Sequence, residues 1–169
     1  AAYHVSSFDL YNGLSASLGI RYDYETSKVD NHTYWTPENN PSGKSKLLVQ
    51  YNEKIYYNQI TPRFTLKQQF TPNKMVYLTV ARGYKPGGFN AAKESEADRS
   101  FAAEYTWNYE IGTKLNFLEN RLSLEASAFY VDWKDQQLSV IVPMVGAVIR
   151  NIGHSDSKGF EVSLSGQPL

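Results

Sequence analysis

The chain has 169 residues, of which 41% are hydrophobic and 14% aromatic, and its 17 lysine and arginine residues balance its 17 aspartate and glutamate residues. A chain without net charge has no field that draws it to nucleic acid, so no nucleic-acid partner is expected. The absence of cysteine excludes a disulfide scaffold, cysteine-ligated zinc and thiol catalysis. No apolar run approaches the roughly 20 residues of a membrane helix, whereas a strand that crosses a membrane needs only about ten residues that alternate apolar with polar.

Alternating apolar and polar side chains, the period of a β-strand, occur in six segments of the chain. The first segment places Leu14 and Ile20 on one face and Arg21 and Asp23 on the other. The fifth loses its alternation after residue 128, where Phe129, Val131 and Trp133 interrupt the polar face. The expected strands are 14–24, 60–70, 75–81, 105–117, 122–128 and about 160–164.

The connections between these strands alternate in length along the chain. Short turns are expected at 71–74 and 118–121, and long connections at 25–59, 86–103 and about 135–158. Short turns therefore gather at one end of the sheet and long loops at the other, as in outer-membrane barrels. The pattern predicts an all-β fold, an antiparallel up-and-down meander of about six strands, and leaves open which face points inward.

The stretch Arg82–Asn90, RGYKPGGFN, ends the third strand. It is not a phosphate-binding loop, because no helical period follows it. Pro86 cannot extend a strand ladder, and Gly87 and Gly88 are expected to adopt positive φ where the strand bends into a loop.

No residue is expected to be catalytic, and no cofactor or metal is expected. The three histidines are scattered along the sequence, and the carboxylates of Glu110, Asp132 and Asp135 have no accompanying nucleophile or oxyanion loop. Aromatic side chains in or near the long loops are the candidate ligand contacts, alternatively rim aromatics of a barrel. These candidates are Tyr34, Trp35, Tyr84, Phe89 and Trp133.

Residues 60–90, 104–137 and 151–169 resemble, in order and spacing, the β-barrel of TonB-dependent outer-membrane receptors, the siderophore-receptor type in particular. Residues 14–25 resemble the strand that precedes them in that family. The most specific pieces are Arg82–Asn90, Glu104 with Trp107 and Tyr109, Glu110–Lys114, and Ser157–Glu161.

The resemblance implies a Gram-negative outer-membrane barrel of about 22 antiparallel strands, filled by a separate plug domain and energised by TonB through a segment ahead of the plug. Residues 1–169 are then expected to be part of that barrel, without plug, signal peptide or C-terminal strand. The implied activity is uptake of a scarce ligand, and the siderophore-receptor type implies a ferric siderophore. The implied lipid face carries Leu14, Ile20, Phe64, Val80, Trp107 and Phe117, and the lumen face Arg21, Arg63, Lys67, Glu110 and Lys114.

Two further expectations concern the strand edges. An isolated open sheet of six strands exposes unpaired backbone at both edges, so the separated fragment is expected to self-associate. The alternative to a receptor fragment is a small soluble β-barrel that closes on itself and binds an apolar ligand, as lipocalin-like folds do.

Overall fold

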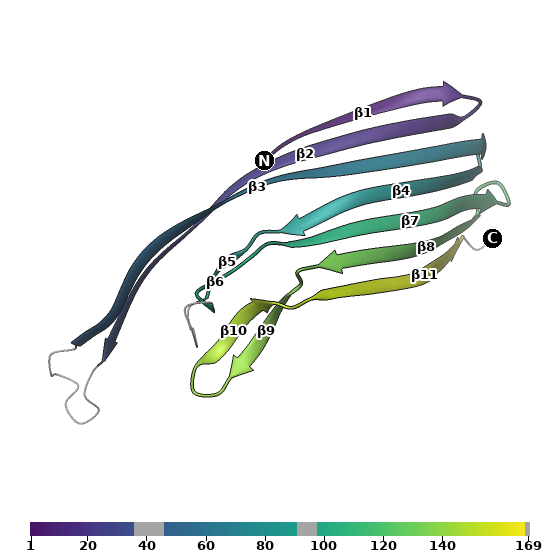
Figure 1. Ribbon diagram of the computed structural model, residues 1–169. Helices are drawn as coiled ribbons and strands as arrows, with labels where there is room; N and C mark the ends of the chain where they lie inside the picture. The colour runs from purple at the N-terminus through teal and green to yellow at the C-terminus, as the bar shows by residue number, and fades with distance from the viewer. Residues whose placement is uncertain (36–45, 91–97, 168–169) are drawn as a thin grey trace.

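The computed structural model describes residues 1–35, 46–90 and 98–167, which form eleven β-strands (Figure 1). Among these residues no helix is long and apolar enough to cross a membrane. The strands are β1 (Ala2–Tyr11), β2 (Leu14–Trp35), β3 (Lys46–Thr71), β4 (Lys74–Lys85), β5 (Gly88–Phe89), β6 (Ser100–Phe101), β7 (Glu104–Phe117), β8 (Leu122–Lys134), β9 (Gln137–Val142), β10 (Gly146–Asn151) and β11 (His154–Gly166).

Seven strands form one open antiparallel sheet in the order β1-β2-β3-β4-β7-β8-β11. Strands β5 and β6 form one small two-stranded sheet, and β9 and β10 form another. The predicted all-β, up-and-down meander is confirmed, with one more strand in the main sheet than expected. Because β1 and β11 each pair on one side only, the described sheet does not close on itself as the small soluble barrel would require.

The two ends of the sheet differ as the connection lengths predicted. Figure 1 shows the tight turns at one end and the long connections at the other. Pro72 and Asn73 separate β3 from β4. In the turn between β7 and β8, Leu118, Glu119 and Asn120 all have positive φ, at 52°, 56° and 70°. We call the end with the long connections the mouth.

Strand register assigns each side chain to one of two faces. Directly paired residues share a face, so the pairings of Leu18 with Phe64 and of Phe64 with Val80 place all three together. By the same reasoning, the residues predicted to share the lipid face lie on one face of the sheet, and those predicted to share the lumen face lie on the other. The apolar face carries Leu14, Ile20, Phe64, Val80, Trp107 and Phe117, and the polar face Arg21, Arg63, Lys67, Glu110 and Lys114.

The sheet is a single layer, and the small core lies at the mouth. Ala103, Val142 and Val148 are the buried hydrophobic residues of the described chain. Ala103 lies between β6 and β7, and the two valines belong to the β9–β10 hairpin. Apolar side chains of the main sheet are widely exposed, including Ile20, Ile111 and Phe160, so the sheet needs an apolar surrounding on that face.

Two sequence predictions of strand extent were wrong, and one strand was not predicted. Residues 2–11 form β1, although their side chains show no clean alternation. Most of the expected connection 25–59 is strand, because β2 continues to Trp35 and β3 begins at Lys46. Both faces of this arm carry polar side chains, and the face with Val29 and Ile55 also carries Glu25, Asn31 and Glu53, so no clean alternation marks it as strand. The expected connection 135–158 contains the β9–β10 hairpin and the start of β11.

Candidate ligand-binding site

Asn90 joins the connection between β4 and β7 to strand β10. Its side chain is buried, with the residue 5% exposed. Its Nδ2 donates to the carbonyl oxygens of Asp98 at 2.8 Å and Ile149 at 2.9 Å, and its Oδ1 accepts from the Ile149 N–H at 2.8 Å. The amide thus pairs with the backbone edge of β10 as a strand would. The last residue of the RGYKPGGFN stretch is therefore a structural clasp.

A second set of polar contacts joins the same segments. The Asp98 carboxylate accepts from Arg150 Nε at 2.7 Å and Nη2 at 3.0 Å, a bidentate pair. Gln137 Nε2 donates to the carbonyl oxygens of Pro86 and Ala102 at 2.8 and 3.0 Å. Its backbone N–H donates to Glu104 Oε2 at 2.6 Å, and Glu104 is 7% exposed. Buried polar groups satisfied in this way hold the loops in one arrangement.

The arm formed by β2 and β3 contacts these loops as well. Arg99 forms an ion pair with Glu53, and its guanidinium carbon lies 4.5 Å from the centre of the Tyr51 ring. The Tyr57 hydroxyl donates to the Phe101 carbonyl oxygen at 3.4 Å. Burial, with nearby Tyr105 as the smaller cause, raises the pKa of Tyr57 above its ordinary value of 10, so the hydroxyl stays protonated as a donor. All three connections at the mouth therefore form one unit.

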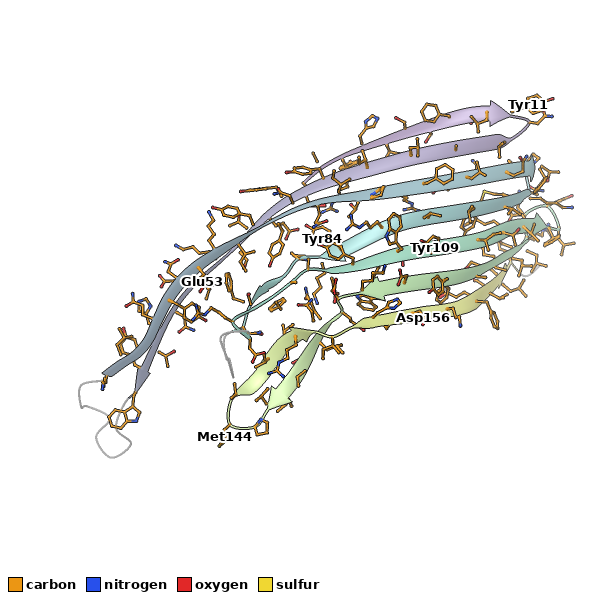
Figure 2. The ribbon with its side chains drawn as sticks, in the orientation of Figure 1. Tyr11, Glu53, Tyr84, Tyr109, Met144 and Asp156 are labelled. Carbon is orange, nitrogen blue, oxygen red and sulfur yellow. The ribbon has the colours of Figure 1, made fainter. Side chains whose placement is uncertain are left out.

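Strands β3 and β4 separate below the mouth. Their ladder ends at the pair Arg63 and Ala81, although β4 stays paired with β7 as far as Lys85. Side chains cross the gap: the Tyr84 hydroxyl donates to Glu25 at 2.5 Å, and Gln59 Nε2 donates to the Tyr105 hydroxyl at 2.9 Å. Figure 2 shows Tyr84 at the end of β4, beside this gap.

A cleft lies in this gap between β2, β3 and β4. The residues lining it are Arg21, Asp23, Glu25, Thr61, Arg82, Gly83, Tyr84 and Pro86. The guanidinium of Arg21 donates to the carboxylate of Asp23 at 2.7 to 3.0 Å. Asp23 is a buried residue, only 3% exposed, and this ion pair neutralises its charge. The cleft offers hydroxyl and paired-charge groups to a bound molecule.

A second cleft lies on the polar face, below the mouth. It is lined by residues from β4, β7, β8 and β11, among them Tyr77, Glu110, Glu125, Phe129 and Glu161. The Tyr77 hydroxyl donates to Glu110 at 2.5 Å, and the ring lies directly over Gly112, where an added Cβ would come within 2.5 Å of it. Because Gly112 has no side chain, the Tyr77 ring fits over it and its hydroxyl orients the Glu110 carboxylate.

Phe129 makes a similar contact on the next pair of strands. It pairs with Gly159, and a Cβ on that glycine would lie 2.9 Å from the Phe129 ring. Phe129, Val131 and Trp133 all share the polar face with Glu125 and Ser127, which explains the lost alternation in β8. The polar face is therefore polar in most rows but carries aromatic rings where facing glycines leave space.

The expected positive φ at Gly87 and Gly88 is wrong. In the described chain the glycines with positive φ are Gly13, Gly146 and Gly153. Close packing explains the glycine pair instead, since a Cβ on Gly87 would lie 2.1 Å from the Phe101 carbonyl oxygen and one on Gly88 would lie 2.9 Å from the Phe101 ring.

The five candidate aromatics do not converge on one point. Tyr34 and Trp35 end β2 at the tip of the arm and are 56% and 54% exposed. Tyr84 crosses the gap to Glu25, and Phe89 pairs with Ser100. Trp133 lies near the mouth end of β8, and its buried Nε1 has no hydrogen-bond partner among the described residues.

Sequence reasoning missed the polar residues that assemble the mouth. Asn90, Glu104, Gln137, Arg150 and Asn151 contribute most of its interloop hydrogen bonds. Only Asn90 and Glu104 carried a signal, since both lie in the stretches most specific to the family resemblance. In the described ranges no group of three or more His, Cys, Asp or Glu side chains is placed to hold a metal ion. The rings of Tyr34 and Trp35 are exposed and accessible to a ligand, whereas the amides of Asn90, Gln137 and Asn151 are bonded within the mouth.

Comparison with known proteins gives one family. The model described as "TonB dependent receptor-like, beta-barrel" matches residues 2–168. The pesticin receptor of Yersinia pestis is 29% identical over 163 residues, which is 96% of this chain and 22% of that protein. The metal-pseudopaline receptor CntO of Pseudomonas aeruginosa is 29% identical over 107 residues, which is 63% of this chain and 14% of that protein. The chain spans about a fifth of the length of the pesticin receptor.

Solved structures show the same fold. The ferric yersiniabactin uptake receptor FyuA from Yersinia pestis superposes with a TM-score of 0.74 at 25% identity, over 96% of this chain and 23% of that one. The ferric-catecholate import receptor Fiu from E. coli K12 superposes with a TM-score of 0.73 at 21% identity, over 97% of this chain and 24% of that one. The second likeness concerns the fold alone.

Proposed function

The chain belongs to the TonB-dependent receptor β-barrel family, and from that premise we propose that it forms part of the wall and mouth of a receptor for a ferric siderophore. Barrels of this family lie in the outer membrane of Gram-negative bacteria, and so does this chain. Its relatives are transport receptors rather than enzymes. The observation that carries the proposal is the match of nearly the whole chain to the barrel model, on a sheet with one polar and one apolar face.

The apolar face is proposed to contact membrane lipid and the polar face to line the lumen. A strand that crosses a membrane satisfies its backbone in the sheet and alternates apolar-out with polar-in. Residues 1–169 then form part of the barrel, and the plug domain of the parent chain packs against the polar face near Glu110 and Lys114. TonB, acting through a segment ahead of the plug, supplies the energy for transport.

The siderophore is proposed to bind at the mouth, held by loops and plug together. Support comes from the names of relatives, which include a probable TonB-dependent siderophore receptor, PiuA, of Acinetobacter baumannii, 32% identical over 103 residues. Tyr34, Trp35, Phe89 and Trp133 are the proposed aromatic contacts. Tyr84 is the weakest of the five candidates for direct contact, because its hydroxyl is already bonded to Glu25.

Uptake of a radiolabelled ferric siderophore by iron-starved cells tests the proposal. Deletion of the gene should abolish accumulation of ⁵⁵Fe from the cognate siderophore, and a plasmid copy should restore it. Accumulation should also stop in a strain that lacks TonB. Unchanged uptake of every siderophore class in the deletion strain would exclude this function.

A further inference from the structure

The gap between β3 and β4 begins at a proline. The ladder of the two strands ends at the pair Arg63 and Ala81, and the register would next set Pro62 opposite Arg82. A proline has no N–H to donate, so the ladder with β4 stops there. The Arg82 side chain crosses to β3 instead, where its Nη1 donates to the Ile60 carbonyl oxygen at 3.3 Å. The gap is therefore set by the sequence, and side chains bridge it.

The cleft in this gap, here called the gap cleft, is reached from the polar face. Arg21, Asp23, Glu25 and Thr61 line it from that face of β2 and β3, and Arg82 lines it from β4. Its volume of about 310 Å³ is at the lower end of the range for small-molecule sites. A small anion or one arm of a larger ligand therefore fits, whereas a whole ferric siderophore does not.

The carboxylates of the gap cleft already accept hydrogen bonds. Asp23 accepts three bonds from the Nε and Nη2 of Arg21, and Glu25 accepts one from the Tyr84 hydroxyl. The Nη1 of Arg21 bonds to no described residue. The Thr61 hydroxyl makes only a 3.5 Å bond to a backbone carbonyl oxygen, so it can turn toward a bound group. The cleft therefore has hydrogen-bond donors to offer.

The charge of Arg82 has no carboxylate partner. Three basic side chains of the described residues are half-buried, and two of them are paired, Arg99 with Glu53 and Arg150 with Asp98. No described residue forms an ion pair with Arg82, and its Nε and Nη2 bond to none of them. A partly desolvated guanidinium gains most from an anion that accepts two of its hydrogen bonds.

We infer that the gap cleft binds a carboxylate or phosphate group through the guanidinium of Arg82, with Thr61 and Arg21 as further donors. The ring of Tyr105, whose centre is 4.7 Å from the guanidinium carbon, holds Arg82 in place for this contact. The anion is either an arm of the transported ligand or a free small anion. In the first case the inference names the chemistry of that ligand, and it then rests on the proposed function.

Isothermal titration calorimetry of the full-length receptor, purified in a neutral detergent and held at constant ionic strength, tests this inference. The probes are citrate and inorganic phosphate, with uncharged triethyl citrate as the comparison. The variants are Arg82→Gln, Arg82→Lys and Thr61→Val. Arg63→Gln is the matched control, because Arg63 is an exposed cation on the same polar face, two residues after Thr61 and outside the cleft.

Wild type should bind citrate and phosphate but not triethyl citrate. Arg82→Gln should weaken the binding of both anions about tenfold, the loss of one charge-assisted contact. Arg82→Lys and Thr61→Val should each weaken it about threefold, since lysine keeps the charge without the planar fork and valine lacks the hydroxyl. Arg63→Gln should stay within twofold of wild type.

Three results would overturn the inference: no binding of either anion by wild type, equal binding by Arg82→Gln, or an equal loss in Arg63→Gln. Thr61→Val leaves the bond from Arg82 to Ile60 intact, so it tests the site even if Arg82→Gln disturbs the fold.

Competition with the siderophore identified by the uptake experiment distinguishes the two sources of the anion. If citrate displaces that siderophore, and Arg82→Gln weakens both ligands by the same factor, the anion is an arm of the transported ligand. If citrate binds together with the siderophore, the cleft holds a free anion. Either result supports the site. Anion binding is measured without transport, so failure of the proposed function, seen as unchanged ⁵⁵Fe accumulation, is distinct from failure of the site.

Discussion

The hydroxyl of Tyr84 donates a 2.5 Å hydrogen bond to Glu25, 59 residues earlier in the chain, across the gap where β3 leaves β4. Here β3 and β4 no longer pair through their backbones, and the part-buried bond from Tyr84 to the Glu25 carboxylate connects the two sides instead. Tyr84 therefore holds the two sides of the gap together, a role that its position in an aromatic loop motif did not reveal.

Tyr84→Phe should lower the free energy of unfolding of the receptor by about 1–2 kcal/mol, because the Glu25 carboxylate loses a hydrogen bond that water replaces only in part. The affinity for the siderophore should change less than threefold. Urea unfolding and ligand titration of the purified protein measure the two quantities. Tyr109→Phe is the control, since the Tyr109 hydroxyl bonds to no described residue and its ring contacts are retained. A large loss of affinity at unchanged stability would instead make Tyr84 a ligand contact.

Asn90→Ala should release β10 from the loop that precedes β7. The Ile149 N–H loses its acceptor and the carbonyl oxygens of Asp98 and Ile149 lose a donor. Loss of bonds worth about 2 kcal/mol together should speed hydrogen exchange of the Ile149 amide about 30-fold. Exchange measured by mass spectrometry over peptides of residues 146–151 checks this. Asn116→Ala, whose side-chain amide bonds to no described residue, should leave those peptides unchanged.

Gly112→Ala should destabilise the barrel by about 1–3 kcal/mol, because the new Cβ would lie 2.5 Å from the Tyr77 ring and the ring must move off Glu110. Gly19→Ala is the control, since the nearest atom to its added Cβ is an ordinary 3.6 Å away. Apparent melting temperatures of the two variants compare the costs. Combining Gly112→Ala with Tyr77→Ala should restore part of the lost stability. If it restores none, the steric explanation is wrong.

The strands that face an apolar surrounding could be predicted from the sequence, and the rest could not. In β4 and β7 the side chains on one face meet an apolar surrounding, so apolar residues such as Val76, Leu78 and Ile111 recur at every second position and mark both segments as strands. The arm beyond Tyr24 has polar side chains on both faces, so only backbone pairing between β2 and β3 defines it. One face of the arm contacts the mouth loops through polar groups such as Glu53 and Tyr57, so the hydrophobic signal is weak although the ladder is intact.

The assembly of the mouth depends on contacts between residues far apart in sequence. Asn90 and Ile149 are 59 residues apart, and Gln137 and Pro86 are 51 apart. Nothing in the local pattern around Gln137 distinguishes it from any other polar loop residue. The candidate aromatics were chosen by residue type, which identifies groups able to bind a ligand but not the polar contacts that hold their loops.

Two adjacent residues of β4 test which face of the sheet meets the lipid. Leu78 belongs to the apolar face, pairing with Leu66 and Ile111, and Thr79 belongs to the polar face, pairing with Thr65 and Glu110. An arginine at the middle of the lipid face costs about 2–4 kcal/mol, whereas one on the lumen face can remain hydrated and can pair with Glu110.

Leu78→Arg should therefore reduce the yield of heat-resistant folded receptor in the outer membrane, and Thr79→Arg should assemble nearly as wild type does. Electrophoretic mobility before and after boiling distinguishes folded from unfolded receptor in both variants. Because the two positions are neighbours on one strand, they share height, local backbone and distance from the mouth, so a difference between them reports the face alone. Loss of assembly in Thr79→Arg with normal assembly of Leu78→Arg would reverse the proposed orientation of the sheet.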